Sequence, residues 1–312
     1  MTTMNTSYEI QTLSKSYFKE KWCSLVLEFK KRSRLPVQAL LTHNYVALGV
    51  NTSFSSFFSS TDTSITTAQT FAPIGLKAPM SDSLFKAVDA LKQCLDTQKI
   101  RNSKINLVIS DCWSYPLVVS LKQTQLSDAE TQVMLLGLYK KQYPELFNEF
   151  ELSWDRQGTQ IVCLAAFKKD LDYLKSELTV RGISTLSIKP LSLEILAKLG
   201  VKVKSSWIAV VEEMQLSLIR VENGLIWEWT TLSSESDLGQ ALSLNLIRYS
   251  SRSKDVCKSL MVFTVSSNPT KISNLSMETL IAANWRITDL SINELQKGEM
   301  GRLIGSIQKL KK

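Results

Sequence analysis

Residues 160–194 read QIVCLAAFKKDLDYLKSELTVRGISTLSIKPLSLE, and the hydrophobic pattern changes three times along them. The apolar run that opens the stretch is short and lacks a helical period, which favours a buried strand. Leucines at 171, 174 and 178 then recur at helical spacing up to Gly182, a residue type that commonly ends helices. The alternation of strands and helices predicts an α/β unit. Its elements are expected as a strand at 160–167, a helix at 169–181, a strand at 183–188 and a short helix at 191–199.

A capping box marks a further helix upstream. Ser127 and Glu130 stand at the spacing of an N-cap and its reciprocal partner, and Pro144 stops the helix that follows. Together with the neighbouring apolar runs this indicates a separate inserted α+β subdomain over 103–182. The segment 111–115 (DCWSY) is interpreted either as a plain loop or as part of a partner groove. The other expected strands of this unit lie at 105–109, 117–121 and 150–154.

A repeated order of elements surrounds the inserted unit. Three strand-like runs and a helix precede it, and the residues from 203 onward repeat that order around the Asn223-Gly224 turn. The repeat predicts a fold of class α/β with two mixed-sheet lobes. The expected division is 1–43 as an N-terminal segment, 44–102 plus 183–202 as the first lobe and 203–312 as the second lobe. The strands expected in the first lobe are 45–50, 54–58 and 70–76, with a helix at 81–95.

Composition excludes several kinds of site. The 312 residues include one histidine, His43, so a zinc site built on several imidazoles is excluded. Glycine occurs 11 times, and no G-x-G-x-x-G or G-x-x-x-x-G-K-[ST] motif is present. Five scattered cysteines without a C-x-x-C pair favour reduced thiols in the cytosol. The formal net charge is +8.

The basic charge is concentrated at the N-terminus. Residues 1–34 hold seven Lys/Arg and three Glu, a net charge of +4. Apolar residues at 18, 22, 25 and 29 recur on one helical face. One interpretation is a basic amphipathic helix for an anionic membrane surface or a partner, and the other is a helix packed on the body of the protein. The contact residues under the first interpretation are Phe18, Trp22, Phe29, Lys30, Lys31 and Arg32.

Several of these segments resemble the PilM family of type IV pilus assembly proteins and the cytoplasmic part of the related GspL. The run 160–194, the helix that begins at Ser127 and the strand-turn pattern at 207–224 are similar to that family. The basic N-terminal extension most resembles the PilM-like protein of mannose-sensitive haemagglutinin pilus systems. The resemblance implies an actin-like fold, with two ribonuclease-H-like lobes and an inserted subdomain.

The chain departs from the family in both phosphate loops. PilM-type proteins carry L-G-V-D-I-G-S after the first strand, and residues 48–53 here read LGVNTS. The resemblance places Asn51 where an aspartate would hold Mg²⁺, with Thr52 and Ser53 beside it as the vestigial nucleotide contacts. In the second lobe, residues 210–214 read VVEEM, with two glutamates and no glycine where a phosphate would lie.

The resemblance and the altered loops together imply a scaffold without catalytic activity, cofactor or metal. It would belong to the inner-membrane assembly platform of a type IV pilus or a type II secretion-like system. The implied partner is the cytoplasmic tail of a bitopic PilN-like protein, with the assembly ATPase as a second partner. The expected location is the cytoplasm, peripheral to the inner membrane.

Two other functions are weighed against the scaffold. The first is an actin-fold nucleotide-binding protein, an ATPase or kinase with a divergent phosphate site for ATP. The second is nucleic-acid binding, suggested by the positive charge. We expect no nucleic-acid partner, because the basic residues gather at the chain ends and no aromatic–basic RNA motif is present.

Overall fold

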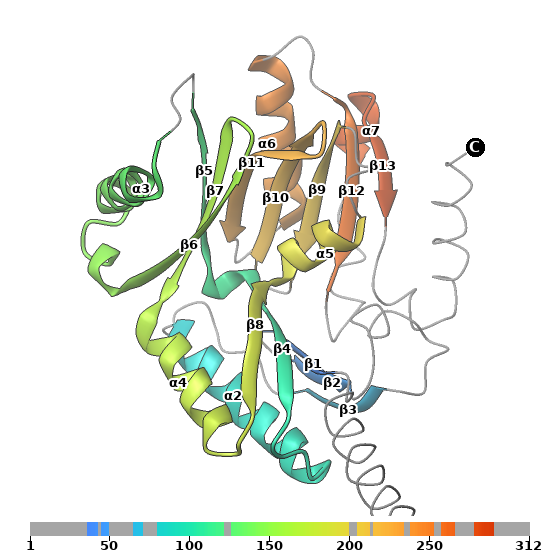
Figure 1. The fold of residues 1–312 in the computed structure, drawn as a ribbon. Coiled ribbons are helices and arrows are strands. Elements are labelled where there is room, and N and C mark those ends of the chain that lie inside the picture. The colour runs from blue at the N-terminus through green and yellow to red at the C-terminus, as the bar shows by residue number, and fades with distance from the viewer. Residues whose placement is uncertain are drawn as a thin grey trace, which may run out of the picture.

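A computed structural model describes ten segments of the chain, which form three sheets with helices packed beside them (Figure 1). The described residues are 36–42, 45–49, 65–70, 80–121, 126–199, 205–212, 215–233, 238–252, 257–265 and 278–289.

The first lobe is a five-stranded mixed sheet in the order β3-β2-β1-β4-β8. Its central strand β1 pairs antiparallel with β2 and parallel with β4. Helix α2 packs on the sheet through Leu84, Val88, Leu91 and Leu95, the face that the sequence predicts. The elements are β1 (Val37–Leu41), β2 (Tyr45–Gly49), β3 (Ile65–Thr70), α2 (Met80–Thr97), β4 (Lys104–Ile109) and β8 (Ser184–Pro190).

The second lobe repeats this topology strand for strand. Its sheet has the order β11-β10-β9-β12-β13, and β9 pairs antiparallel with β10 and parallel with β12. The β10–β11 turn holds Asn223 and Gly224 at positive φ, as the sequence predicts. The elements are β9 (Ser205–Val211), β10 (Gln215–Glu222), β11 (Leu225–Ser233), α6 (Leu238–Arg252), β12 (Ser259–Thr264), α7 (Glu278–Ala282) and β13 (Arg286–Asp289). The expected duplication of the two lobes is therefore present.

The inserted subdomain is a three-stranded antiparallel sheet in the order β5-β7-β6, with helix α3 beside it (Figure 1). Its aromatic core includes Tyr115, Tyr139, Phe150 and Phe167, and Tyr139 Oη donates to the Tyr115 carbonyl over 2.6 Å. The capping box of Ser127 and Glu130 starts α3 as predicted. The elements are β5 (Tyr115–Ser120), α3 (Asp128–Gln142), the short helix η3 (Phe147–Glu149), β6 (Phe150–Gln157) and β7 (Gln160–Phe167).

The predicted start of the first lobe at residue 44 is wrong. Residues 37–41, assigned to the N-terminal segment, form β1, the central strand of the first sheet. The sequence VQALL is apolar at four of its five positions, because a strand covered on both faces does not alternate. The turn after it contains no glycine or proline, so the sequence lacks that turn signal between β1 and β2.

A further expectation needs correction. Residues 104–109, assigned to the inserted subdomain, form β4, which lies between β1 and β8 in the first lobe. The strand that pairs with β2 is β3 at 65–70, and residues 71–76 of the strand expected at 70–76 lie outside the described residues. The expected strand at 54–58, the terminal helix at 292–309 and the basic segment 1–34 lie outside the described residues.

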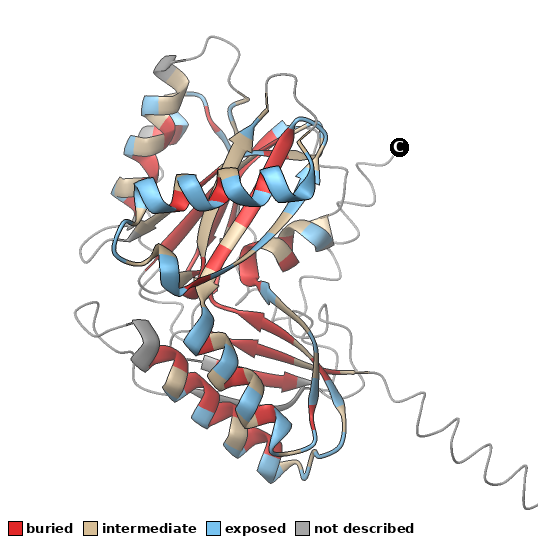
Figure 2. Cartoon of the chain, turned by 60° about the vertical axis from the view of Figure 1, so that its left-hand side comes forward, coloured by how far each residue is buried: buried red, intermediate tan, exposed pale blue. Residues whose placement is uncertain are grey.

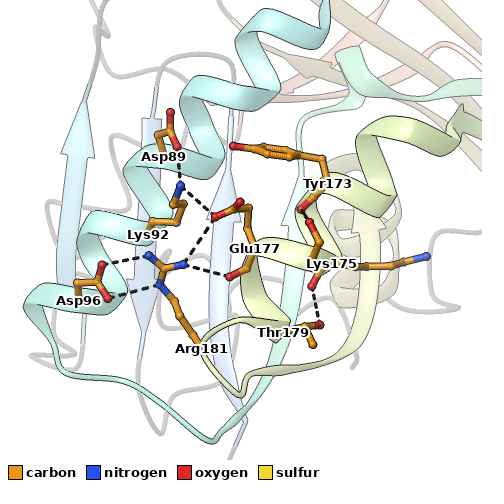
Figure 3. Close-up of polar contacts among 9 residues, drawn as sticks. Asp89, Lys92, Asp96, Tyr173, Lys175, Glu177, Thr179 and Arg181 are labelled. Carbon is orange, nitrogen blue, oxygen red and sulfur yellow. Dashed lines mark hydrogen bonds and ion pairs between the residues drawn. The ribbon is translucent and has the colours of Figure 1, made fainter.

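Helix α4 (Lys168–Thr179), which the sequence pattern assigns to the inserted subdomain, instead packs along α2 and buries Leu174 and Leu178 in the core of the first lobe. A chain of ion pairs joins the two helices (Figure 3). Lys92 Nζ lies 3.1 Å from Asp89 Oδ1 and 3.0 Å from Glu177 Oε2. Arg181 Nη2 lies 3.2 Å from Asp96 Oδ2, and its Nη1 lies 3.7 Å from Glu177 Oε2. Glu177 therefore links the lysine and the arginine of this network.

The three units share an apolar core where they meet. Val108 of the first lobe, Val162 of the inserted sheet and Ile208 of the second lobe belong to one cluster of buried side chains. Helix α5 (Leu191–Leu199) contributes Leu191 and Ile195 to the same cluster. Figure 2 shows buried residues continuing through the strands of both lobes.

Candidate functional site

The candidate site lies where strands of both lobes end. Parallel strands β4 and β8 of the first lobe and β9 of the second lobe lead into Ser110, Leu191 and Glu212 respectively. In open α/β sheets, ligands characteristically bind beyond the carboxyl ends of the strands. The chemistry of the side chains at this junction therefore determines which ligand could bind between the two lobes.

Asp111 is the centre of a buried hydrogen-bond network. It opens a 3-10 helix, η2 (Asp111–Trp113), and is 1% exposed. The Ser192 main-chain N–H donates to Asp111 Oδ1 over 3.0 Å, and the Ser192 hydroxyl donates to Oδ2. Ser192 lies at the start of α5, so the carboxyl group fastens the end of β4 to the end of β8.

Glu212 joins the second lobe to this network. The main-chain N–H of Asp111 donates to Glu212 Oε1 over 3.0 Å, across the boundary between the lobes. Glu212 is 4% exposed, and its main-chain N–H donates to the carbonyl of Gln215 within the β9–β10 turn. Among the described residues, Glu212 Oε2 has no hydrogen-bond partner. A negative charge on a buried carboxylate is poorly stabilised when one of its oxygens has no hydrogen-bond donor.

Burial and mutual repulsion keep the two carboxyl groups from ionising together. Loss of solvation, followed by the negative charge of Asp111, raises the pKa of Glu212 to about 8. Loss of solvation also raises the pKa of Asp111, although the hydrogen bonds from Ser192 oppose that shift. The pair therefore carries at least one proton at neutral pH, and it titrates as a unit.

Cys112, which is half-buried, lies beside these carboxyl groups and is not a nucleophile. The Ser110 hydroxyl donates to Cys112 Sγ over 2.9 Å, and the Cys112 main-chain N–H donates to Ser110 Oγ over 3.2 Å. Loss of solvation and the nearby Glu212 charge raise the pKa of the thiol well above its ordinary value. The thiolate needed for nucleophilic chemistry is thus strongly disfavoured.

In the duplicated topology the first-lobe counterpart of the second-lobe loop follows β1, whereas the sequence prediction puts it at 48–53, after β2. The duplicated topology pairs the β9–β10 turn with the β1–β2 turn, so the counterpart of residues 212–214 is 42–44. Asn51, Thr52 and Ser53 follow β2 rather than β1, and they lie outside the described residues. This misplacement follows because the sequence prediction takes β2 as the first strand of the lobe and misses β1. The second-lobe loop, with Glu212 in it, is at the position that the sequence predicts.

Sequence reasoning missed the roles of Asp111 and Ser192. The segment 111–115 connects β4 to β5, as the loop interpretation expects, but it forms η2 and buries Asp111 and Trp113. Trp113 Nε1–H donates to Ser83 Oγ of α2 over 2.8 Å. A polar residue directly after the apolar run of β4 was the available signal. The six membrane or partner contacts expected at 18–32 lie outside the described residues.

Solved structures share this architecture. A chain of the PilM-PilN type IV pilus biogenesis complex aligns with a TM-score of 0.56 and 11% identity, over 84% of this chain and 90% of that chain. A Bacteroides thetaiotaomicron protein of unknown function, described as having an actin-like ATPase fold, aligns with a TM-score of 0.52 and 10% identity, over 84% and 93%. The chain has the actin-like fold.

The actin-like architecture expected from the PilM resemblance is therefore confirmed. The cytoplasmic domain of EpsL, an inner membrane component of the Vibrio cholerae type II secretion system, aligns over 85% of this chain and 93% of its own at 10% identity, with a TM-score of 0.49. No protein-family profile matches the sequence, and no functionally curated protein matches it.

The described part of the actin-like body contains neither a metal-binding cluster nor a membrane-spanning helix. No cluster of three or more His, Cys, Asp or Glu side chains in them is arranged to hold a metal ion. No helix within the same residues is long and apolar enough to cross a membrane.

Proposed function

We propose that this actin-like protein is a non-catalytic scaffold of a type IV pilus or type II secretion-like assembly platform. The observation that carries the proposal is the buried Asp111–Glu212 contact at the ends of the strands. A nucleotide clamp needs hydrogen-bond donors and positive charge facing the phosphates. Here the junction holds two carboxyl groups and a thiol, and the hydrogen bond from the Asp111 main-chain N–H to Glu212 Oε1 joins the two lobes.

The proposed partner is the cytoplasmic tail of a bitopic PilN-like protein. The fold shared with a chain of the PilM-PilN complex supports this choice. The test is isothermal titration of the full-length protein with a synthetic peptide of that tail, beside a scrambled peptide of the same composition. We expect saturable binding of the native peptide only. Absence of binding at tens of micromolar would contradict the partner assignment.

A nucleotide titration separates the scaffold from the enzyme alternative. A ligand at one hundred times its dissociation constant stabilises a folded protein by about 2.7 kcal/mol. We expect no change in the unfolding midpoint with millimolar Mg-ATP or Mg-ADP, and no phosphate release. A clear upward shift would instead favour an actin-fold ATPase or kinase with a divergent phosphate site.

Peripheral contact with the inner membrane is proposed for the basic N-terminal segment. Juxtamembrane lysines and arginines gain roughly 1 kcal/mol each near an anionic surface. Flotation with phosphatidylglycerol-containing vesicles should recover the wild type, and replacement of Lys30, Lys31 and Arg32 by glutamate should abolish recovery. Equal flotation of both proteins would contradict this contact. The assembly ATPase is the proposed second partner, and co-purification with it is the corresponding assay.

A further inference from the structure

Helix α3 carries apolar side chains on both of its faces. Leu135 and Tyr139 point into the inserted subdomain and are fully covered. Val133 lies on the opposite face and is 70% exposed, and Leu136, which is 37% exposed, lies at the edge of that face. Figure 2 shows exposed residues along the outward side of this helix. An isolated surface helix normally has one apolar stripe, so a second stripe indicates a second surface to be covered.

Gly137 lies on the same outward face, in the middle of the helix. A Cβ added to it would meet no atom of this chain within 4 Å, so packing inside the molecule does not require a glycine there. Glycine destabilises a helix interior relative to alanine. Its use is to let another backbone approach closely, and the outward face is where such an approach is open.

Opposite charges at the two ends of α3 favour an antiparallel copy of the same helix as the element that packs on its outward face. Glu130 lies in the first turn, and Lys140 and Lys141 lie in the last turn. Glu130 and Lys140 stand five residues before and five residues after Leu135. Val133 and Gly137 stand two residues before and two after it. An antiparallel copy of the same helix, related by a two-fold axis near Leu135, therefore sets Glu130 against Lys140 and Val133 against Gly137.

We propose that the outward face of α3 is a self-association surface, which pairs with α3 of a second copy of this chain in antiparallel orientation. The face is complementary to itself in shape, because the valine side chain meets the glycine, and in charge. One helix pair is smaller than a standard protein–protein interface. The dimer is consequently weak and forms in the micromolar range or above. The inference does not depend on the proposed pilus role.

The first test is sedimentation velocity of the full-length protein over a concentration series. Leu136→Glu should weaken self-association at least about tenfold. Val180→Glu, at another highly exposed apolar residue, is the matched control and should leave it unchanged. A wild type that stays monomeric at the highest concentration, or equal effects of both variants, would overturn the proposal. Binding of the α3 face to anionic vesicles without self-association would also overturn it.

A glycine variant separates association from folding. Gly137→Ala should raise the unfolding midpoint of the monomer, because alanine favours the helix, while weakening the dimer. A purely structural glycine would change the midpoint alone. An alanine variant that associates as tightly as the wild type would contradict close helix approach at Gly137.

Charge reversal tests the orientation. Lys140→Glu sets two glutamates against each other in its homodimer, and Glu130→Lys sets two lysines against each other. In an antiparallel pair the mixture restores the opposite-charge contacts of the wild type. In a parallel pair the wild type itself would set like charges together, so neither variant alone would be weaker than the wild type and the mixture would associate more tightly than the wild type. We expect each variant alone to associate weakly and the mixture to regain wild-type association. Circular dichroism checks that Glu130→Lys, which loses its bond to the Ser127 main chain, still folds. Failure of the mixture would overturn the antiparallel pairing.

Discussion

The main-chain N–H of Asp111 donates to Glu212 Oε1 over 3.0 Å, and this bond joins residues 101 positions apart in sequence and in different lobes. Each residue follows a strand of its own sheet. In the duplicated topology these strands, β4 and β9, belong to opposite lobes. A carboxyl group thus accepts a bond at the junction where a nucleotide clamp would present donors.

Neutralising Glu212 should change how stability depends on pH. The folded pKa of Glu212 is raised to about 8, above the ordinary value of 4.5. The folded state therefore holds a proton that the unfolded state releases between these values, so stability falls as the pH rises from about 5 to 8. The loss over this range is roughly 4 kcal/mol, at about 1.4 kcal/mol per pKa unit. Glu212→Gln should flatten this slope and match or exceed wild-type stability at pH 8.

Urea denaturation at several pH values measures that slope. Glu145→Gln, at an exposed glutamate of the same chain, is the control and should keep the wild-type pH dependence. A Glu212→Gln protein that loses stability with rising pH as steeply as the wild type would show that the carboxyl pair does not control it.

Asp111 should contribute to stability mainly as a hydrogen-bond acceptor for Ser192, and less through its negative charge. Asp111→Ala leaves the buried N–H and hydroxyl of Ser192 without their acceptor and should lower the free energy of unfolding by about 2–4 kcal/mol. Asp111→Asn keeps an acceptor for Ser192, so its loss should be smaller. Ser192→Ala should cost about 1 kcal/mol. Chemical denaturation at pH 6 ranks the three variants, and an alanine variant as stable as the asparagine variant would contradict this order.

The ion pairs between α2 and α4 should give a small, salt-dependent contribution. Arg181→Ala removes contacts to Asp96 and Glu177, and we expect the thermal midpoint to fall by roughly 1–3 °C at low salt. Lys175→Ala breaks one long, exposed pair with Glu151 and should have less effect. Differential scanning calorimetry at low and high salt compares them. An Arg181 effect that is independent of salt would point to packing of its alkyl chain.

The hydroxyl of Tyr139 should stabilise the inserted subdomain. It donates to the Tyr115 carbonyl at 2.6 Å from a buried position, and burial raises the pKa of the phenol above its ordinary value. Tyr139→Phe leaves that carbonyl without this donor and should cost about 1 kcal/mol, with no pH dependence between 5 and 8. Denaturation at the two pH values measures both, and Tyr173→Phe on α4 serves as a control at a half-buried tyrosine.

Local signals in the sequence were sufficient for many elements. The Ser127–Glu130 capping box, the Asn223-Gly224 turn and the leucine stripe of α2 predict features that depend on neighbouring residues. The position of β1 and the assignment of β4 to the first-lobe sheet depend on pairing with strands far along the chain. Their residues are apolar in either assignment, so hydrophobic pattern cannot decide the sheet to which they belong.

The candidate site was harder to predict because its residues come from three strand ends. Glu212 was singled out as a group that would repel phosphate, and its position in the β9–β10 turn is confirmed. Its contact with Asp111 depends on how the lobes meet, which no local pattern encodes. The same applies to Ser192, an ordinary serine in sequence that becomes the donor to a buried carboxyl group.

The central position of β1 limits how the polypeptide can be shortened. A fragment that starts at residue 44 would lack the strand between β2 and β4, leaving two rows of main-chain groups unpaired in the middle of a sheet. Such a fragment should accumulate in inclusion bodies, whereas one that starts at residue 35 keeps the whole sheet. Trimming of the basic end for crystallisation should therefore stop before Pro36.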